Sequence, residues 1–349
     1  MTCSFIIPSY NSAHTIARCL DSIYSLSLNE CEFEIVFIDD CSTDNTCDIV
    51  AAYQTKHTNL ILLKQPKNNR QGAARNRGVK IANGEYICFV DSDDAVREGV
   101  VEAIHTAKEM KTDLTAFHYG NANEQGVIIE EKEKLCFAKG QIFSGIDMQN
   151  THPYWCSAPW GYIYSKHFLS ESDYPFAEGV LYEDSDFVAA HLYYAKRMAY
   201  SHEIGYIAYY REGSTTHSNN YKNTADYFLL GVRMLTLYTT IQKEQKSLHC
   251  KTADGIQAFA DSVLDGAINN ITYSLKRLFK LRNMKEIKSF YKRIDSYVNR
   301  RVLYNDKRLY KFPKHWSQLA FISIRYKCLS IVLNTCLAFI YRAYCKLKH

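Results

Sequence analysis

Three aspartates that follow an apolar segment are the first sign of chemistry in the sequence. In "EYICFVDSDDA", residues 86–90 have the composition and length of a buried β-strand. Asp91, Asp93 and Asp94 come directly after it. Crowded carboxylates resist ionisation unless a cation lies beside them. A D-x-D pair at a strand end can bind a hard divalent cation, Mn²⁺ or Mg²⁺, with substrate phosphates as further ligands. The alternative is an acidic turn that caps a helix.

The composition narrows the class of protein. The chain has 349 residues, 47% of them hydrophobic and 23% charged, which indicates a globular protein of one large or two smaller domains. Its twelve cysteines form no C-x-x-C pair and no Cys/His cluster at zinc spacing, which favours free thiols in a reducing compartment. The N-terminus enters a strand without a signal-peptide core, so we expect a cytoplasmic protein, with the inner face of the membrane as an alternative location.

Two common nucleotide-binding motifs are missing from the sequence. There is no G-x-x-x-x-G-K-[ST] and no G-x-G-x-x-G after the first strand pattern. These absences argue against a P-loop enzyme and against a dinucleotide-dependent oxidoreductase. A metal that bridges a diphosphate, and that neutralises charge on a departing nucleoside diphosphate, remains the inference from the acidic turn.

Strand and helix patterns alternate over the first hundred residues. This alternation predicts a mostly parallel sheet with helices on both faces, whose ligands lie beyond the carboxyl ends of the strands. Ser9-Tyr10, Asp39-Asp40 and the acidic turn all fall at such ends, so we expect them to converge. The predicted strands are residues 3–11, 33–40, 59–66 and 85–91, and the first of them ends in a Pro-Ser-Tyr-Asn turn. The predicted helices start near Ser12, at an N-cap formed by Ser42 or Thr43, and at Gln71.

The pattern changes along the rest of the chain. Short strands and loops are mixed between residues 113 and 213, and the sequence becomes mostly helical after about Tyr221. We therefore predict an α/β catalytic domain over residues 1–218 and a helical region over 219–349. The net charge of +5 is unevenly spread, and the Lys/Arg-rich stretch at 276–314 suits an anionic membrane surface. A solvated helical face is the common alternative, and no nucleic-acid module is present.

The last segment of the chain is apolar and flanked by basic residues. Its uninterrupted core between Lys327 and Arg342 is shorter than the ~20 residues that a membrane-spanning helix needs. We expect an amphipathic helix that lies on an anionic membrane. A helix packed on the catalytic domain or on a second subunit of a homodimer is the alternative.

Four segments in order resemble a family 2 glycosyltransferase of the GT-A fold. They are "FIIPSYNSAHTIARCLDSI", "EIVFIDDCSTDNT", "QGAARNRGVKIANGEYICFVDSDD" and "VLYEDSDF", and the resemblance covers roughly residues 1 to 215. It implies a nucleotide-sugar donor, usually a UDP-sugar, a divalent metal, and inversion at the anomeric carbon. The expected setting, by resemblance alone, is the assembly of a bacterial surface polysaccharide on a glycan or lipid-linked acceptor.

The resemblance also implies which residues bind the donor. Asp40 matches the carboxylate that reads the uracil edge, and Asp93 matches the more direct metal ligand, with Asp91 as its partner. Arg211 and His217 lie in "YYREGSTTHS", which is similar to the loop that closes over the diphosphate. Arg211 is expected to contact phosphate, and His217 either completes the metal or phosphate shell or has a surface role. The remaining matched donor residues are Pro8, Ser9, Tyr10, Gly72, Arg75, Asp91 and Ser92.

The acceptor side is implied by two further segments. In "YEDSDF", Asp184 matches the base that takes the proton from the acceptor hydroxyl, and Glu183 matches a supporting acceptor contact. First-turn acids that favour a helix dipole are the alternative for both residues. "APWGYIYSKHFL" resembles the acceptor floor, where Trp160 and Gly161 are candidate contacts. Trp160 would stack on a sugar or lie in the core. The family often has Lys at the position of Tyr162.

Two other functions remain compatible with the acidic site. A nucleotidyltransferase would also need acidic metal ligands, but it would release pyrophosphate rather than UDP. A non-catalytic scaffold could keep the same fold with an idle site. The presence of Asp91, Asp93 and Asp184 together argues against the scaffold.

Overall fold

The computed structural model of the chain describes most of the N-terminal four fifths of the sequence. It describes residues 1–153, 155–172, 174–210, 221–248 and 253–280, together with residues 286, 289, 290, 292 and 293. The described residues divide into two compact units. Of the described residues, the first unit holds 1–210 and 253–259. The second unit holds 221–248, 260–280 and the described residues beyond 280. The predicted domain boundary after residue 218 lies outside the described residues.

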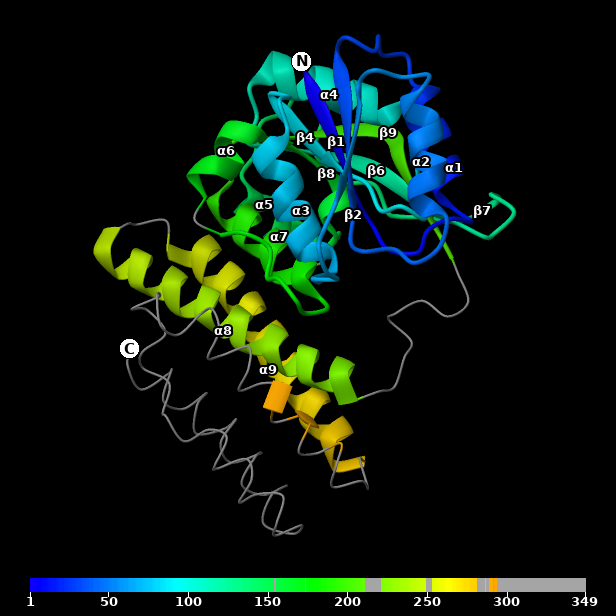
Figure 1. Cartoon of the computed structure of the whole chain (residues 1–349). Helices are drawn as coiled ribbons and strands as arrows, with labels where there is room; N and C mark the ends of the chain where they lie inside the picture. The colour runs from blue at the N-terminus through cyan, green and yellow to red at the C-terminus, as the bar shows by residue number, and fades with distance from the viewer. Residues whose placement is uncertain are drawn as a thin grey trace. The chain divides into compact units, whose positions relative to one another are not determined.

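A single nine-stranded sheet forms the centre of the first unit (Figure 1). Its order is β3-β2-β1-β4-β8-β6-β9-β5, and β7 pairs with β6. β1 pairs in parallel with β2 and β4, and β2 pairs in parallel with β3. The strands are β1 Cys3–Ser9, β2 Phe33–Asp39, β3 Leu60–Lys64, β4 Tyr86–Phe89, β5 Ala95–Val96, β6 Leu114–Ala122, β7 Ile128–Glu131, β8 Tyr162–Ser165 and β9 Met198–Tyr209.

Helices cover both faces of this sheet. The chain moves outward from β1 through β2 to β3 and then returns past β1 to β4, so right-handed crossovers place α1 and α2 on one face and α3 on the other (Figure 1). The predicted mostly parallel sheet between helices is therefore confirmed. The helices of this unit are α1 Ile16–Tyr24, α2 Thr46–Gln54, α3 Arg70–Ile81, α4 Gly99–Met110, α5 Gly145–Thr151, α6 Lys166–Glu171 and α7 Glu183–Tyr194, with a 3₁₀ turn η1 at Pro159–Gly161.

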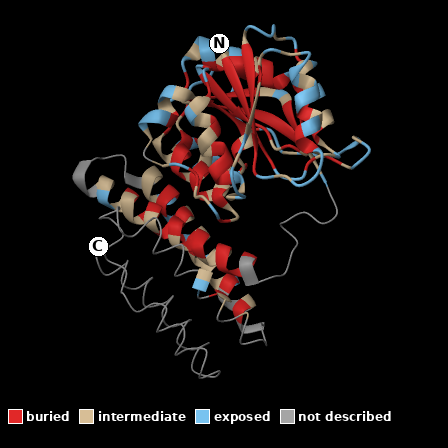
Figure 2. Cartoon of the chain, in the orientation of Figure 1, coloured by how far each residue is buried: buried red, intermediate tan, exposed pale blue. Residues whose placement is uncertain are grey.

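Burial follows the periodicity of each element. Every residue of β1 and β2 is buried, as expected for central strands covered on both faces, and Figure 2 shows the sheet as the buried centre of the unit. α1 buries Ile16, Cys19, Leu20 and Ile23, which lie on one face of a helix. α3 packs closely on β1, because a Cβ atom at Gly78 would lie 2.4 Å from Ile6 Cγ2.

The sheet departs from an all-parallel arrangement on the side of β8. β8 pairs antiparallel with both β4 and β6, whereas β6 and β9 are parallel to each other. The two-residue strand β5 immediately follows the acidic turn and pairs antiparallel with the far part of β9. This pairing matters for the site, because it brings the end of β9 to the acidic turn.

The predicted N-cap of the second helix is wrong. α2 begins at Thr46 with Asn45 at the N-cap position, which is three residues after Ser42 and two after Thr43. The Ser42 hydroxyl instead accepts a hydrogen bond from the Asn11 N–H at 2.9 Å. Serine and threonine before a helix can stabilise turns as well as helix ends. Here Ser42 and Thr43 form hydrogen bonds with Asn11 and so fix the loop between β2 and α2.

The second unit is helical, as predicted for the region after Tyr221. α8 spans Tyr221–Leu248 and α9 spans Ala253–Lys280. Arg293 Nε donates to Asp226 Oδ1 at 2.6 Å, and Ser274 Oγ donates to the Thr224 carbonyl at 2.5 Å. Within the part of the chain that the structure describes, no helix combines the length and apolar character needed to cross a bilayer. The predicted amphipathic segment near the C-terminus lies outside that part.

Candidate active site

The acidic turn Asp91–Asp94 is closed by its own backbone. The Asp94 N–H donates to the Asp91 carbonyl at 3.1 Å, which makes a four-residue β-turn directly after β4. The Ser92 hydroxyl lies 2.6 Å from the Ser12 hydroxyl in the loop before α1. The turn therefore follows the carboxyl end of β4 and contacts the loop that follows β1, as the strand-end prediction requires.

Two arginines hold the turn from opposite faces of the sheet. Arg75 in α3 is 2% exposed, and its Nη2 donates to Asp91 Oδ1 at 2.7 Å. Arg18 in α1 donates through Nη2 to the Asp93 main-chain carbonyl, and its guanidinium lies 3.6 Å from the centre of the Tyr209 ring. Each cation offsets part of the negative charge that the turn concentrates.

The end of β9 supplies the remaining support. The Tyr206 hydroxyl donates to Asp94 Oδ2 at 2.7 Å and accepts from the Asp91 N–H at 3.1 Å. The Tyr209 N–H donates to Asp94 Oδ1 at 2.8 Å. Burial raises the pKa of Asp94 well above its ordinary value, and the neighbouring charges of Asp93 and Asp91 raise it further. Asp94 is thus the buried anchor of the turn.

A second carboxylate site lies where β2 ends. Asp40 is buried, and its Oδ1 accepts from the Asn69 N–H at 2.8 Å and from Gln65 Nε2 at 3.0 Å. Burial raises the pKa of Asp40, although the hydrogen bond from Asn69 acts in the opposite direction. The Asp40 N–H donates to the Ser9 carbonyl at 2.7 Å, so the ends of β1 and β2 are joined.

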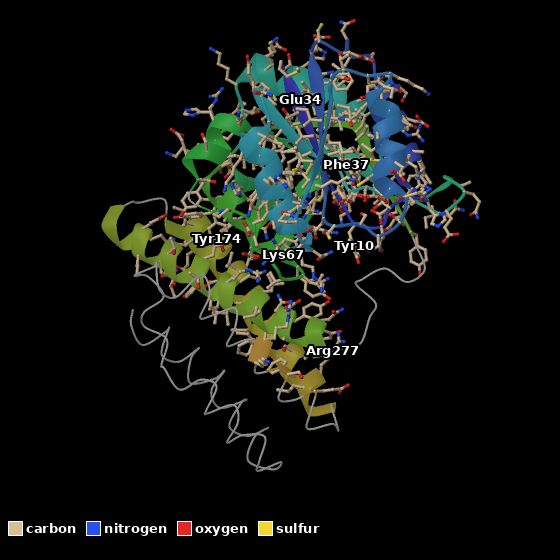
Figure 3. All side chains as sticks on the ribbon, viewed as in Figure 1. Tyr10, Glu34, Phe37, Lys67, Tyr174 and Arg277 are labelled. Carbon is tan, nitrogen blue, oxygen red and sulfur yellow. The ribbon has the colours of Figure 1, made fainter. Side chains whose placement is uncertain are left out.

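Pro8, Ser9 and Tyr10 lie at this same edge. Pro8 and Ser9 are buried in β1, whereas Tyr10 is 51% exposed. Figure 3 labels Tyr10 and Lys67 at this edge and Glu34 at the opposite edge of the sheet. An exposed aromatic ring beside Asp40 is the arrangement that a nucleoside base would use.

The catalytic pair predicted at the start of α7 is brought to the acidic turn by Arg75. Arg75 Nη1 donates to Glu183 Oε1 at 2.6 Å, and Glu183 is buried. Burial raises the pKa of Glu183, and Arg75 offsets part of this rise. Asp184 is partly exposed, its Oδ1 accepts from the Ser185 N–H at 2.8 Å, and burial likewise raises its pKa. As a whole residue, Asp184 is therefore more exposed than Glu183.

Gly72 explains how α3 and α7 approach each other so closely. A Cβ atom at Gly72 would lie 2.3 Å from the Ala177 carbonyl oxygen and 3.0 Å from Glu183 Cγ. The loop before α7 is also tied to α3, because the Gly179 N–H donates to the Asn69 carbonyl at 2.9 Å. A glycine is required here by space rather than by backbone conformation.

The predicted acceptor floor contains one accessible ring and one core ring. Trp160 is half-buried and stacks flat on Tyr206, with ring centres 4.4 Å apart and planes 3° apart. Gly161 is buried, and a Cβ there would lie 2.6 Å from Cys156 Sγ. Tyr162 is buried, and its hydroxyl donates to the Cys156 carbonyl at 2.8 Å, so this residue belongs to the core.

Comparison with known proteins agrees with this geometry. Residues 4–148 match the family model described as Glycosyl transferase family 2. This range contains Asp40, Arg75 and the acidic turn. Residues 4–148, which we call the family 2 domain, are thus similar to the family 2 glycosyltransferases.

Two curated relatives of the family 2 domain are named as poly(ribitol-phosphate) glycosyltransferases. The poly(ribitol-phosphate) beta-glucosyltransferase of Bacillus spizizenii is 39% identical over 129 residues, which is 36% of this chain and 20% of the relative. The poly(ribitol-phosphate) beta-N-acetylglucosaminyltransferase TarS of Staphylococcus aureus is 35% identical over 128 residues, which is 36% of this chain and 22% of the relative. The matched segments therefore span about a fifth of the length of these curated relatives.

The similarity in structure extends further along the chain. The crystal structure of S. aureus TarS residues 1–349 in complex with UDP-GlcNAc has a TM-score of 0.61 and 25% sequence identity. The aligned region covers 86% of this chain and 81% of that chain. This match confirms the GT-A fold that the sequence predicted for the family 2 domain.

The acidic turn of the family 2 domain fits a divalent cation. Asp91 is 24% exposed at its side chain and Asp93 is partly exposed, so both carboxylates lie near the surface. Among the described residues, no group of three or more His, Cys, Asp or Glu side chains is arranged to hold a metal by itself. Such a site suits Mn²⁺ or Mg²⁺ with phosphate oxygens as additional ligands. Arg211 and His217, the other predicted phosphate and metal contacts, lie outside the described residues.

Sequence reasoning missed the residues that support the turn of the family 2 domain. Arg18 and Tyr209 lie in segments that resemble the family but were given no role there, and Tyr206 lies in no such segment. Each of the three reaches the turn because its element packs there. The third aspartate of "DSDD" was one available signal, because a buried carboxylate needs hydrogen-bond donors. Asp94 was recognised as part of the acidic cluster but was given no role.

Proposed function

We propose that the chain transfers a sugar from a UDP-sugar to a hydroxyl group of a glycan or lipid-linked acceptor, with inversion at the anomeric carbon. The observation that carries this proposal is Arg75, which contacts both Asp91 of the acidic turn and Glu183 at the start of α7. One guanidinium thereby holds Asp91 on the proposed donor side and Glu183, the neighbour of the predicted base Asp184. The family 2 domain and the UDP-GlcNAc complex of TarS support the choice of donor.

The donor would bind along the carboxyl ends of β1, β2 and β4. Asp40 would accept a hydrogen bond from the base, and Tyr10 would lie against it, because both stand at the joined ends of β1 and β2. Asp91, Ser92 and Asp93 would lie beside the diphosphate. Gly72 and Arg75 would border it from α3. A divalent cation bound at Asp91 and Asp93 would supply charge neutralisation for the departing UDP.

The acceptor would approach from the side of α7. Asp184 would remove the proton from the attacking hydroxyl, because it is the more exposed residue of the pair and Glu183 is engaged by Arg75. Trp160 and Gly161 would form part of the floor under the acceptor, with the Trp160 ring available for stacking on a sugar. An attack from this side, opposite the diphosphate, gives a single displacement and hence inversion.

Contact with a membrane surface is a further part of the proposal. The basic and apolar sequence after residue 276 would bring the domain to an anionic membrane that carries a lipid-linked acceptor, and a homodimer is the alternative use of the apolar segment. We place the reaction on the cytoplasmic side because nucleotide-sugar donors are the proposed substrates.

The test is turnover of a panel of UDP-sugars, including UDP-GlcNAc and UDP-glucose, with Mn²⁺, with Mg²⁺ and with a chelator. The proposal predicts metal-dependent release of UDP from at least one donor, and a product of inverted anomeric configuration when an acceptor is present. Release of pyrophosphate from a nucleoside triphosphate, with no release of UDP, would instead identify a nucleotidyltransferase.

A further inference from the structure

The hydroxyl and the ring of Tyr206 contact two different parts of the candidate site. The hydroxyl joins the two ends of the acidic turn, since it accepts from the Asp91 N–H at 3.1 Å and donates to Asp94 Oδ2 at 2.7 Å. The ring stacks on Trp160 with planes 3° apart. Tyr206 is 0% exposed, so it touches neither donor nor acceptor directly.

The other contacts of the turn hold different atoms, so none of them replaces this hydroxyl. Asp94 Oδ1 accepts a hydrogen bond from the Tyr209 N–H at 2.8 Å, and Asp94 Oδ2 accepts one from the Tyr206 hydroxyl. The Asp91 side chain is directed to Arg75, but its N–H is held by Tyr206. Loss of the hydroxyl would remove the partner of the partly buried Asp91 N–H and of the buried Asp94 Oδ2, at the two residues that flank Ser92 and Asp93.

The Trp160 contact adds a mechanical connection. Trp160 is half-buried between Tyr206, which covers one face, and Tyr119, whose ring meets it edge-on with centres 4.9 Å apart. A change in the position of Trp160 is therefore transmitted to the ring of Tyr206, because packed aromatic rings move together. The acceptor floor and the metal turn then share one rigid support.

We propose that Tyr206 is a positioning residue that holds the acidic turn in its metal-binding geometry and couples that geometry to Trp160 on the acceptor side. This inference rests on the proposed function. It assigns a role to a residue that makes no contact with the reacting groups, and it predicts that a change on the acceptor side alters binding on the donor side.

The test uses calorimetric titration of the full chain with UDP, with and without Mn²⁺. Tyr206→Phe keeps the ring and removes the hydroxyl, so we expect metal-dependent UDP binding to weaken on the order of tenfold while binding without metal stays unchanged. Tyr162→Phe is the matched control, because its hydroxyl is equally buried and donates to the Cys156 carbonyl away from the turn. We expect this control to bind UDP as the wild type does.

The coupling is tested with Trp160→Ala, which removes the ring that stacks on Tyr206. We expect metal-dependent UDP binding to weaken several-fold, although Trp160 makes no donor contact in the proposed function. Wild-type affinity in Tyr206→Phe would overturn the positioning role, and equal weakening in Tyr162→Phe would show a general effect of losing a buried hydroxyl. Unchanged UDP binding in Trp160→Ala would overturn the coupling.

Amide hydrogen exchange provides a readout that needs no nucleotide. We expect faster exchange in the peptide that contains Asp91–Asp94 for Tyr206→Phe, and no change there for Tyr162→Phe. Unchanged exchange in Tyr206→Phe would contradict the inference. A wild-type chain that binds no UDP would overturn the proposed function, and the exchange result would still decide whether Tyr206 holds the turn.

Discussion

Arg75 and Glu183 form a buried ion pair, and a second contact of Arg75 joins the start of α7 to the acidic turn. Nη1 of Arg75 donates to Glu183 Oε1 at 2.6 Å, and Nη2 of the same guanidinium donates to Asp91 Oδ1 at 2.7 Å. The two nitrogens of the fork lie at a fixed separation, so the acidic turn and the start of α7 are set relative to each other. The pair also engages Glu183, so Asp184 remains the residue that we propose as the base.

Replacing Arg75 by methionine should destabilise the fold strongly. The substitution leaves Glu183 and Asp91 without their cation, and breaking a buried pair costs about 3–5 kcal/mol of unfolding free energy. The loss should be smaller at pH 5 than at pH 7. A carboxyl whose folded-state pKa exceeds its unfolded value destabilises the fold increasingly as the pH rises past the unfolded value, and burial already raises the pKa of Glu183.

Urea unfolding at both pH values measures this effect. Arg77→Met is the matched control, because Arg77 lies in the same helix and donates one exposed hydrogen bond to the Lys64 carbonyl at 2.8 Å. We expect it to cost about 1 kcal/mol or less at either pH. Equal stability of the two variants would show that the Arg75 pair contributes nothing to the fold.

Replacing Asp184 by asparagine should remove catalysis and spare donor binding. The variant keeps the size of the side chain but cannot accept a proton, so the transfer rate should fall by about 10²–10⁴-fold. UDP affinity should stay within about twofold, because Asp184 lies on the acceptor side. Steady-state rates and calorimetry give both numbers.

Asp147→Asn is a suitable control for that substitution. Asp147 is also an acid in the first turn of a helix, where it completes a capping box with Ser144 in α5, and it lies in none of the proposed donor or acceptor contacts. We expect a small loss of stability and no loss of turnover. A parallel loss of UDP binding in Asp184→Asn would mean that the residue is structural.

The rate of transfer should begin to fall, as the pH is lowered, at a higher pH than an ordinary aspartate base would give. Burial raises the pKa of Asp184 above its ordinary 3.8, although Arg75 acts against this rise. A general base works only when deprotonated, so kcat/KM should fall as the pH decreases through this raised pKa. UDP binding measured over the same pH range separates the base from the donor site. A rate that stays constant down to pH 4 would exclude Asp184 as the base.

Replacing Gly72 by alanine should disturb the contact between α3 and α7. The added methyl carbon would lie 2.3 Å from the Ala177 carbonyl oxygen, so the loop before α7 must move, at a cost of about 1–3 kcal/mol. Gly255→Ala in α9 is the control. Its nearest neighbour would be Asn150 Nδ2 at 3.4 Å, and alanine favours helix by about 1 kcal/mol. Thermal unfolding should therefore separate the two variants in opposite directions.

The parts of the site that lie on the four parallel strands could be predicted from the sequence. Asp40 and the acidic turn follow apolar strands, and a parallel sheet places such strand ends at one edge. Glu183 and Asp184 could be placed beside them only through the family resemblance. No local pattern shows that α7 meets α3 through Gly72 and Arg75.

The supports of the acidic turn could not be predicted in the same way. Tyr206 reaches Asp94 because the short strand β5 pairs with β9, and that pairing joins residues more than a hundred positions apart in the chain. Tyr162 shows the same limit from the other side. Its position suggested the acceptor floor, but packing against Cys156 makes it a core residue. Side-chain direction in both cases depends on tertiary contacts rather than on local sequence.

The most direct measurement is calorimetric titration with UDP, GDP and CDP, each with and without Mn²⁺, on the wild type and on Asp93→Asn. A donor site at the acidic turn predicts that UDP binds more tightly than the other two nucleotides, that Mn²⁺ strengthens this binding, and that Asp93→Asn removes the metal-dependent part. Absence of nucleotide binding by the wild type under every condition would contradict the enzymatic function and would favour a non-catalytic scaffold.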